Sequence, residues 1–216
     1  MKDLGIELAK TIALAMIERY KLSRQKLKEE YEKQGYKIVF AHELSQCSRK
    51  PVMADQLQAL DLSVSWKPTI LLGEVVERGI EKYLTSLGFS PPSKPWSKIV
   101  SANGEMYVVV GSPDFVDNVE KPYRVVDVKY TASQPSVKDH HIVRMRVYLW
   151  LTGAQEGILL YVSPEGLKSY TVIETMTDRE VASLIETRPA PMWDWECKLC
   201  PFESYCNQAV RGGKGG

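Results

Sequence analysis

The clearest pattern along the chain is an alternation of apolar and polar positions that predicts two paired strands within residues 111–131. β-Branched and aromatic residues, which favour extended backbone, fill both arms, and the polar run 118–122 separates them. Side chains alternate between the two faces of a strand, so Asp127 and Lys129 share one face while the neighbouring valines point the other way. The stretch therefore predicts a hairpin that presents an acidic and a basic side chain together.

The predicted register brings two carboxylates together. If the turn centres between Glu120 and Lys121, antiparallel pairing places Asp114 opposite Asp127, and directly opposed Cβ atoms lie about 4.5–5.5 Å apart. Two carboxylates at so short a distance repel each other unless a cation lies between them, and a hard divalent metal accepts such oxygen ligands. Lys129 would then orient the attacking water, which makes the hairpin a candidate hydrolytic centre. The alternative is a solvated strand face with a weak surface ion pair.

Apolar residues at helical spacing predict helices on either side of this hairpin. The first covers residues 3–34, is broken near Ser23 and has a solvated second half. Ser45 is expected to cap a short helix that follows it. A further helix covers residues 71–87 and buries one stripe of side chains, which are Val75, Val76, Ile80, Tyr83, Leu84 and Leu87.

Two later helices and four further strand regions complete the predicted elements. The helices cover residues 136–152 and about 177–187, and the second begins with a capping box formed by Thr177 and Glu180. The strand regions are 36–40, a hairpin over 94–110 that turns at Asn103-Gly104, 156–163 and 167–173. Because the 94–110 hairpin leads into the central one, we expect a three-stranded meander. The whole order predicts an α/β domain with a mixed sheet flanked by helices.

Composition and charge narrow the class of protein. With 216 residues, 44% of them hydrophobic and 25% charged, the chain suits a single globular domain over residues 1–210 with a flexible tail at 211–216. The net charge of +1 gives no overall attraction to nucleic acid, so a basic surface must come from local clusters. Two such clusters are the Lys-rich residues 21–33 and the group His140, His141, Arg144 and Arg146.

The four cysteines point to a metal site rather than to disulfides. The sequence shows no secretory signal and no stretch of membrane-spanning length, so we expect a cytoplasmic protein, where cysteines more often bind metal. One cysteine, Cys47, lies in the N-terminal portion of about 1–65. The other three lie in a C-terminal segment of about 190–208, and they are Cys197, Cys200 and Cys206. This distribution favours an iron–sulfur cluster over structural zinc, while a redox Cys-x-x-C would need only two of them. Either metal would join the two ends of the chain.

Together these motifs resemble the RecB-like branch of the PD-(D/E)XK nucleases, and in particular the CRISPR-associated exonucleases of the Cas-four family. The resemblance extends from about residue 45 to residue 206. It is carried by Gly111-Ser112-Pro113-Asp114, by Asp127-Val128-Lys129, by a following helix with Tyr148, and by the one early and three late cysteines.

The resemblance implies a restriction-endonuclease-like fold with an iron–sulfur clasp, and it implies a role for each residue. Asp114, Asp127 and the backbone carbonyl of Val128 would hold Mg²⁺ or Mn²⁺, and Lys129 would be the catalytic lysine. The helix around Tyr148 would line the DNA channel. The cluster, of the 4Fe–4S or 2Fe–2S type, would be held by Cys47, Cys197, Cys200 and Cys206.

Two positions depart from the pattern of the resembled family. Glu77 stands where that family usually carries a histidine metal ligand, and a carboxylate is a reasonable ligand for Mg²⁺ or Mn²⁺. Arg144 stands in place of a glutamine four residues before Tyr148, where it could contact a DNA phosphate.

The function implied by the resemblance is metal-dependent hydrolysis of DNA. The resemblance implies an exonuclease that degrades single-stranded DNA in the 5′→3′ direction, with Tyr148 stacking on bases. It also implies that this exonuclease trims new spacers during CRISPR adaptation, together with integrase partners. One alternative is a non-catalytic nucleic-acid-binding module clasped by zinc. Another is an electron carrier, which gives no reason for the paired carboxylates.

Overall fold

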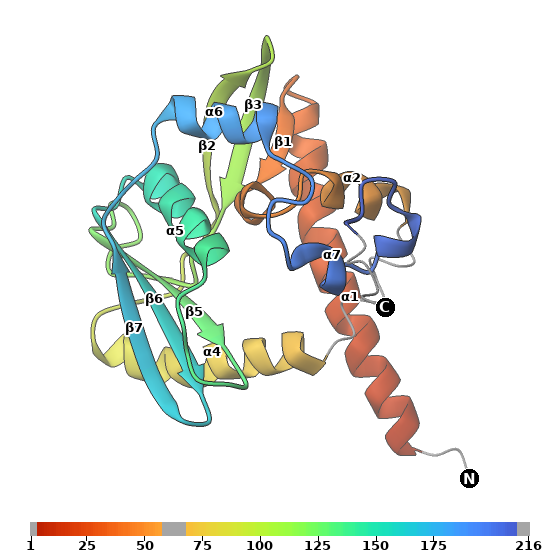
Figure 1. Cartoon of the computed structure of the whole chain (residues 1–216). Helices are drawn as coiled ribbons and strands as arrows, with labels where there is room; N and C mark the ends of the chain where they lie inside the picture. The colour runs from red at the N-terminus through yellow and green to blue at the C-terminus, as the bar shows by residue number, and fades with distance from the viewer. Residues whose placement is uncertain (1–3, 58–67, 211–216) are drawn as a thin grey trace, which may run out of the picture.

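The structure is a computed structural model that describes residues 4–57 and 68–210. Its described strands are β1 (Lys37–Phe40), β2 (Trp96–Ala102), β3 (Glu105–Gly111), β4 (Phe115–Val116), β5 (Arg124–Tyr130), β6 (Glu156–Ser163) and β7 (Gly166–Val172). Within the described ranges these strands form two mixed sheets, with the orders β1-β3-β2 and β4-β5-β6-β7 (Figure 1). In the first, β1 lies parallel and β2 antiparallel to β3; in the second, β5 and β6 are parallel and the outer pairs are antiparallel.

Helices surround these sheets. They are α1 (Leu4–Glu32), α2 (Arg49–Gln56), α4 (Pro68–Ser86), α5 (Asp139–Thr152), α6 (Asp178–Thr187) and the short α7 (Glu196–Leu199), with 3₁₀ turns η1 (Ala41–Ser45) and η2 (Glu203–Tyr205). Figure 1 shows α1 as a long rod whose N-terminal half projects away from the two sheets. The α/β fold class predicted from the sequence is confirmed. No helix in the described part of the chain is long and apolar enough to cross a membrane.

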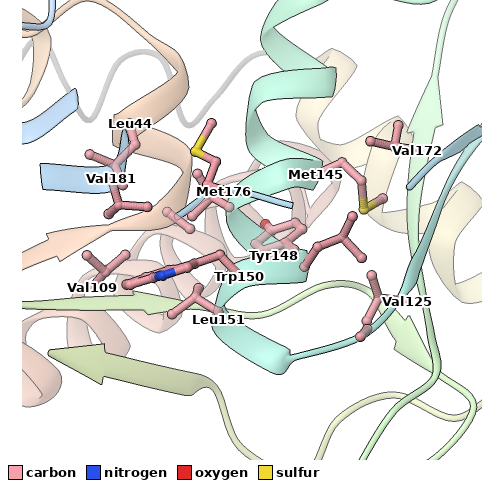
Figure 2. Packing of buried hydrophobic residues seen from close by; sticks show 14 of the residues in the cluster. Leu44, Val109, Val125, Met145, Tyr148, Trp150, Leu151, Val172, Met176 and Val181 are labelled. Atoms are coloured by element: carbon pink, nitrogen blue, oxygen red, sulfur yellow. The ribbon is translucent and has the colours of Figure 1, made fainter. Parts of the chain in front are cut away.

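Helix α5 packs against both sheets and supplies much of the main core. Buried side chains of α5, Met145 and Trp150 among them, form one cluster with Val109 of β3, Val125 of β5 and Val172 of β7 (Figure 2). One helix therefore links the two sheets.

The opposite face of the second sheet carries a smaller core. Val126 and Val128 of β5 pack there with Phe115 of β4 and Leu84 of α4. Strand β5 thus has both faces covered, which explains why its sequence reads as a nearly continuous apolar run. The buried environment of β5 is what makes any charged side chain on it energetically costly.

The central hairpin has the register that the sequence predicts. Phe115 pairs with Val126, which centres the turn between Glu120 and Lys121. The second predicted hairpin is also confirmed, because Asn103-Gly104 turns between β2 and β3 with φ angles of 49° and 72°. Both residue types tolerate such positive φ angles.

The predicted three-stranded meander is wrong. Strand β3 pairs with β1 and β2, whereas the next strand, β4, pairs with β5 in the other sheet. The chain leaves the first sheet at Gly111 and enters the second within a few residues. Alternation of side chains reveals strands but not which neighbour each strand hydrogen-bonds to, so the change of sheet was not visible in the sequence.

Three predictions for the helices are also corrected. Ser45 does not cap a helix, because it ends η1 and its Oγ donates to the carbonyl of His42. Helix α1 is continuous through Ser23. The buried stripe of α4 is narrower than expected, since Val76, Ile80 and Leu84 pack inward, whereas Val75, Tyr83 and Leu87 are exposed.

The predicted boundaries of the domain stay a prediction. The expected flexible tail at 211–216 lies outside the described residues, as do residues 1–3 and 58–65 of the expected N-terminal portion. The strands and helices after residue 130 begin and end within a few residues of their predicted positions, and the capping box of Thr177 and Glu180 is present.

Candidate active site

The site is built where the chain passes from one sheet to the other. A Cβ atom on Gly111 would lie 2.6 Å from the Cβ of Ala41 and 2.9 Å from a methyl group of Leu151, so only glycine fits this crossing. Three residues later the backbone N–H of Asp114 donates to the carbonyl of Val126 at 3.0 Å. This bond fixes Asp114 at the start of β4, beside the middle of β5.

The two predicted acidic residues come together. Continuing the pairing of Phe115 with Val126 by one residue places Asp114 opposite Asp127. The Oδ2 atom of Asp114 accepts a hydrogen bond of 2.6 Å from the backbone N–H of Val128, and Asp127 is only 2% exposed. A partly buried carboxyl group and a fully buried one are therefore held side by side.

Lys129 reaches back to the same point. Its ammonium group forms an ion pair with Oδ2 of Asp127 and donates to the carbonyl of Val128 at 3.1 Å. Apart from this ion pair, Oδ2 of Asp127 accepts no hydrogen bond within the described ranges. A bound cation would add to the coordination of this buried carboxylate.

The pKa values of Asp114 and Asp127 are shifted in opposite directions. Burial, and then the charge of Asp127, raises the pKa of Asp114 to about 8. Burial also acts to raise the pKa of Asp127, but Lys129 and Arg144 outweigh it, so that pKa is lowered. At neutral pH Asp127 is thus ionised and Asp114 holds a proton. A divalent cation between them would favour ionisation of both.

The donor set fits a hard divalent metal. Two carboxylates and the carbonyl of Val128 are oxygen ligands of the kind that Mg²⁺ and Mn²⁺ prefer. Burial raises the pKa of Glu77 on α4, and the charges of Lys129 and Asp127 act on it as well, so it lies near the pair. Residues 4–57 and 68–210 hold no group of three or more His, Cys, Asp or Glu gathered closely enough for a metal ion. The role of Glu77 as a third ligand stays a prediction.

Helix α5 contributes the two residues expected to bind DNA. Arg144 is half-buried, its charge acts on Asp127, and its Nε has no hydrogen-bond partner among the described residues. Tyr148 is 7% exposed and, with Gly111 and Ser112, lines a cavity of about 200 Å³. So little of its ring is exposed that base stacking on it would require rearrangement.

The predicted basic cluster around α5 is wrong in part. Burial, aided by neighbouring positive charges, lowers the pKa of His140 to about 4 and that of His141 to about 3, so neither ring is charged at neutral pH. Arg146 forms an ion pair with Glu180. Arg144 is the cluster member that keeps its charge directed at the acidic pair.

The four cysteines line one cavity. Its volume is about 50 Å³, and its walls come from the N-terminal portion and the C-terminal segment together. All four are free thiols, and burial raises the pKa values of Cys47 and Cys200. The arrangement brings one early and three late sulfur atoms to a common space, which suits the predicted cluster, although the described thiols are not gathered at metal-binding distances. The cluster itself stays a prediction.

Sequence reasoning missed the residue that joins these two segments. Glu196 is 7% exposed; its Oε1 accepts from the backbone N–H of Cys47 at 2.8 Å, and its Oε2 accepts from Met192 and Trp193. The indole N–H of Trp193 donates to the carbonyl of Ser45 at 3.0 Å. A glutamate beside a Cys-x-x-C resembles any solvated helix residue in sequence, so no signal would have revealed it.

The fold and the buried acidic pair define a class of metal-dependent nucleases, and comparison with known families agrees. The family model described as the PD-(D/E)XK nuclease superfamily matches residues 15–207. The chain therefore belongs to the PD-(D/E)XK nuclease superfamily, and it is a nuclease.

Within this superfamily the chain is similar to one characterised group. It is 25% identical over 174 residues to the CRISPR-associated exonuclease Cas4 of Saccharolobus solfataricus, covering 78% of this chain and 86% of that protein. The crystal structure of SSO0001 superposes with a TM-score of 0.75 at 22% sequence identity, over 88% of this chain and 98% of that one. The resemblance drawn from the motifs is thereby confirmed.

Proposed function

We propose that this protein is a metal-dependent DNA exonuclease. The observation that carries the proposal is the pair of a partly buried Asp114 and a buried Asp127, with the ammonium group of Lys129 against Asp127. A structural protein gains nothing from a carboxyl group that is forced to hold a proton beside a buried carboxylate. The relative from Saccharolobus solfataricus, whose name is that of an exonuclease, supports the same reading.

The residues present support phosphodiester hydrolysis. Asp114, Asp127 and the carbonyl of Val128 would hold Mg²⁺ or Mn²⁺, with Glu77 as the further carboxylate. When bound, the metal supplies charge that stabilises the transition state at phosphorus. Lys129 would orient the attacking water and offset the negative charge that develops as the new P–O bond forms and the bond to the leaving sugar oxygen breaks.

Helix α5 would hold the substrate strand next to these groups. Arg144 is placed to contact a phosphate, because it lies near the acidic pair and its Nε is unpaired in the described part of the chain. Tyr148, which lines the neighbouring cavity, would contact the strand from there. We further propose single-stranded DNA as the substrate and 5′→3′ degradation.

The cellular role that we propose is processing of DNA before its integration in CRISPR adaptation, together with integrase proteins. It rests on the similarity to the Cas4 exonuclease. An iron–sulfur cluster held by Cys47, Cys197, Cys200 and Cys206 would fasten the C-terminal segment to the N-terminal portion. In this role the cluster is structural.

The function is tested by Asp127→Ala and Lys129→Ala in the full chain. Either change should abolish manganese-stimulated degradation of single-stranded DNA, because each removes one part of the centre, and it should leave the absorption spectrum of the cluster intact. Glu120→Gln and Lys121→Ala, in the exposed turn of the same hairpin, serve as matched controls and should degrade DNA at the wild-type rate. Undiminished digestion by both site variants would contradict the proposal.

A further inference from the structure

A row of aromatic rings connects the C-terminal cysteine segment to helix α5. The ring of Trp195 lies 4.9 Å from that of His140, which lies 4.1 Å from that of His141. Nδ1 of His141 is 2.7 Å from the hydroxyl of Tyr161 on β6. Figure 1 shows the first turn of α5 directed toward the segment that descends from α6 to α7, where Trp195 lies.

The two ends of this row differ in exposure. Tyr161 is only 2% exposed, whereas Trp195 is 43% exposed. The inner end lies close to the acidic centre, because the charge of His141, when protonated, acts on Asp127. Trp195 is therefore the solvent-exposed end of a row of rings whose other end lies near the proposed catalytic groups.

The surroundings of this row are positively charged. Lys129, Lys138 and Arg144 all act on the ring of His140, and Asp139 is the opposing negative charge. Phosphate groups are attracted to such cations, and nucleobases stack on exposed aromatic rings whatever their identity. Cations beside an exposed tryptophan are the combination that binds single-stranded nucleic acid without sequence preference.

The backbone next to Trp195 is anchored by hydrogen bonds. The neighbouring Trp193 is anchored twice: its indole N–H donates to the carbonyl of Ser45, and its backbone N–H donates to the carboxylate of Glu196. An exposed ring on an anchored backbone loses little conformational entropy when a base stacks on it.

We propose that Trp195, backed by His140, is a stacking site for a nucleobase of single-stranded DNA on its way to the acidic centre. This inference rests on the proposed function, since it names how that substrate is held. It also gives the cysteine segment a second task, because the same segment that lines the cysteine cavity carries the stacking ring.

The test measures binding of a labelled oligo(dT) to the full chain in EDTA, where nothing is hydrolysed. Trp195→Leu keeps apolar bulk but removes the ring, so the dissociation constant should rise at least about fivefold, as expected for the loss of one stacked base. Trp195→Phe keeps a ring and should stay within about twofold of the wild type. Tyr205→Leu is the matched control, because Tyr205 is 65% exposed in the same segment but lies outside the row of rings, and it should not change affinity.

A second measurement does not depend on any variant. The wild-type protein should bind oligo(dT) at least about fivefold more tightly than an abasic strand of equal length, because the abasic strand offers phosphates without bases. Equal binding of the two strands, or equal affinity of Trp195→Leu and wild type, would overturn the inference. Since binding is measured without cleavage, failure of the nuclease test and failure of this test are separate results.

Discussion

Asp114 and Asp127 differ in protonation although they are the same residue type on paired strands. The difference arises because Lys129 forms its ion pair with Asp127, whereas Asp114 receives a single backbone N–H at Oδ2. Such a pair is unfavourable in the metal-free protein, and its cost depends on pH. The acidic pair therefore has a signature in stability that can be measured without any substrate.

We expect the metal-free protein to lose stability as the pH rises from about 4 to about 8. The pKa of Asp114 is about 8 in the folded chain and 3.8 as a model value, so across this window the unfolded state releases a proton that the folded state keeps. Asp114→Asn, neutral in both states, should melt at a higher temperature than the wild type near pH 8 and lose that advantage toward pH 4. Thermal melts in EDTA measure this.

The control for this prediction is the divalent metal. Adding Mn²⁺ near pH 8 should raise the melting temperature of the wild type, because the ion binds only the folded chain, and should leave Asp114→Asn unchanged. A wild-type melting temperature that is flat between pH 4 and 8 and insensitive to the Asn substitution would show that Asp114 ionises normally.

The acidic pair could be predicted from the sequence, whereas Glu196 could not. Opposition of Asp114 and Asp127 depends only on where one turn is centred, and that turn is marked by a polar run in a continuous apolar stretch. The role of Glu196 depends on backbone N–H groups of Cys47 and Met192, which are distant from each other in sequence. Only the folded chain brings them together.

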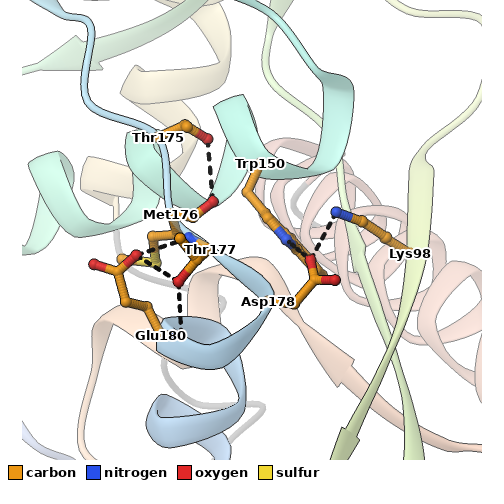
Figure 3. A network of polar contacts seen from close by, with 7 residues as sticks. All are labelled: Lys98, Trp150, Thr175, Met176, Thr177, Asp178 and Glu180. Carbon is orange, nitrogen blue, oxygen red and sulfur yellow. Dashed lines mark hydrogen bonds and ion pairs between the residues drawn. The ribbon is translucent and has the colours of Figure 1, made fainter.

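At the scale of elements, helix α6 has the most complete local signals. Oγ1 of Thr177 accepts from the backbone N–H of Glu180, and the Glu180 carboxylate accepts from the backbone N–H of Thr177 (Figure 3). Beside this capping box, the carboxylate of Asp178 accepts hydrogen bonds from the indole N–H of Trp150 and from the ammonium group of Lys98. The start of α6 is thus tied both to its own first turn and to α5 and β2.

Removal of the cap should have a moderate effect. Thr177→Ala should lower the free energy of unfolding by about 1 kcal/mol, because a backbone N–H loses its acceptor, which corresponds to about 2–4 °C in melting temperature for a chain of this size. The matched control is Thr175→Ala, since the hydroxyl of Thr175 only donates to the carbonyl of Met176 at 3.4 Å. Equal melting temperatures for the two variants would contradict a capping role.

The positions of the helices and strands were predicted better than the pairing of the strands. Periodicity placed β5, β6, β7 and α5 within a few residues, because each is long and has a clear pattern. It did not reveal that β3 and β4 belong to different sheets, because the apolar residues of a strand do not say which strand lies beside it. Nor did it distinguish Val75 from Val76 on α4, because the two positions are equally apolar and only packing decides which faces the sheet.

At the scale of the whole molecule, the two sheets depend on one narrow crossing. Gly111 lies where β3 ends, pressed between Ala41 of η1 and Leu151 of α5. Helix α5 touches both sheets at this level, so a change there affects the first sheet, the helix and the path to Asp114 together. Among the described residues, few positions connect so many parts of the fold.

Gly111→Ala should therefore be destabilising. The added methyl group has no room, and overpacking of this kind costs about 1–3 kcal/mol, measurable as a lower midpoint of urea denaturation. Gly79→Ala on α4 is the control, because nothing lies within 4 Å of a Cβ there and alanine favours a helix by about 1 kcal/mol. If both variants shifted the midpoint upward, the crossing would be looser than its contacts indicate.

The hydrogen bonds around Glu196 bear on how the proposed iron–sulfur cluster would be acquired. Backbone N–H groups from both segments converge on this one carboxylate, and the Ser48 N–H reaches the Pro189 carbonyl at 3.2 Å, all without help from the sulfur atoms. If the four cysteines hold the proposed iron–sulfur cluster, these bonds would keep the two segments joined before it is inserted, and reconstitution of the apoprotein with iron and sulfide would require no denaturation step.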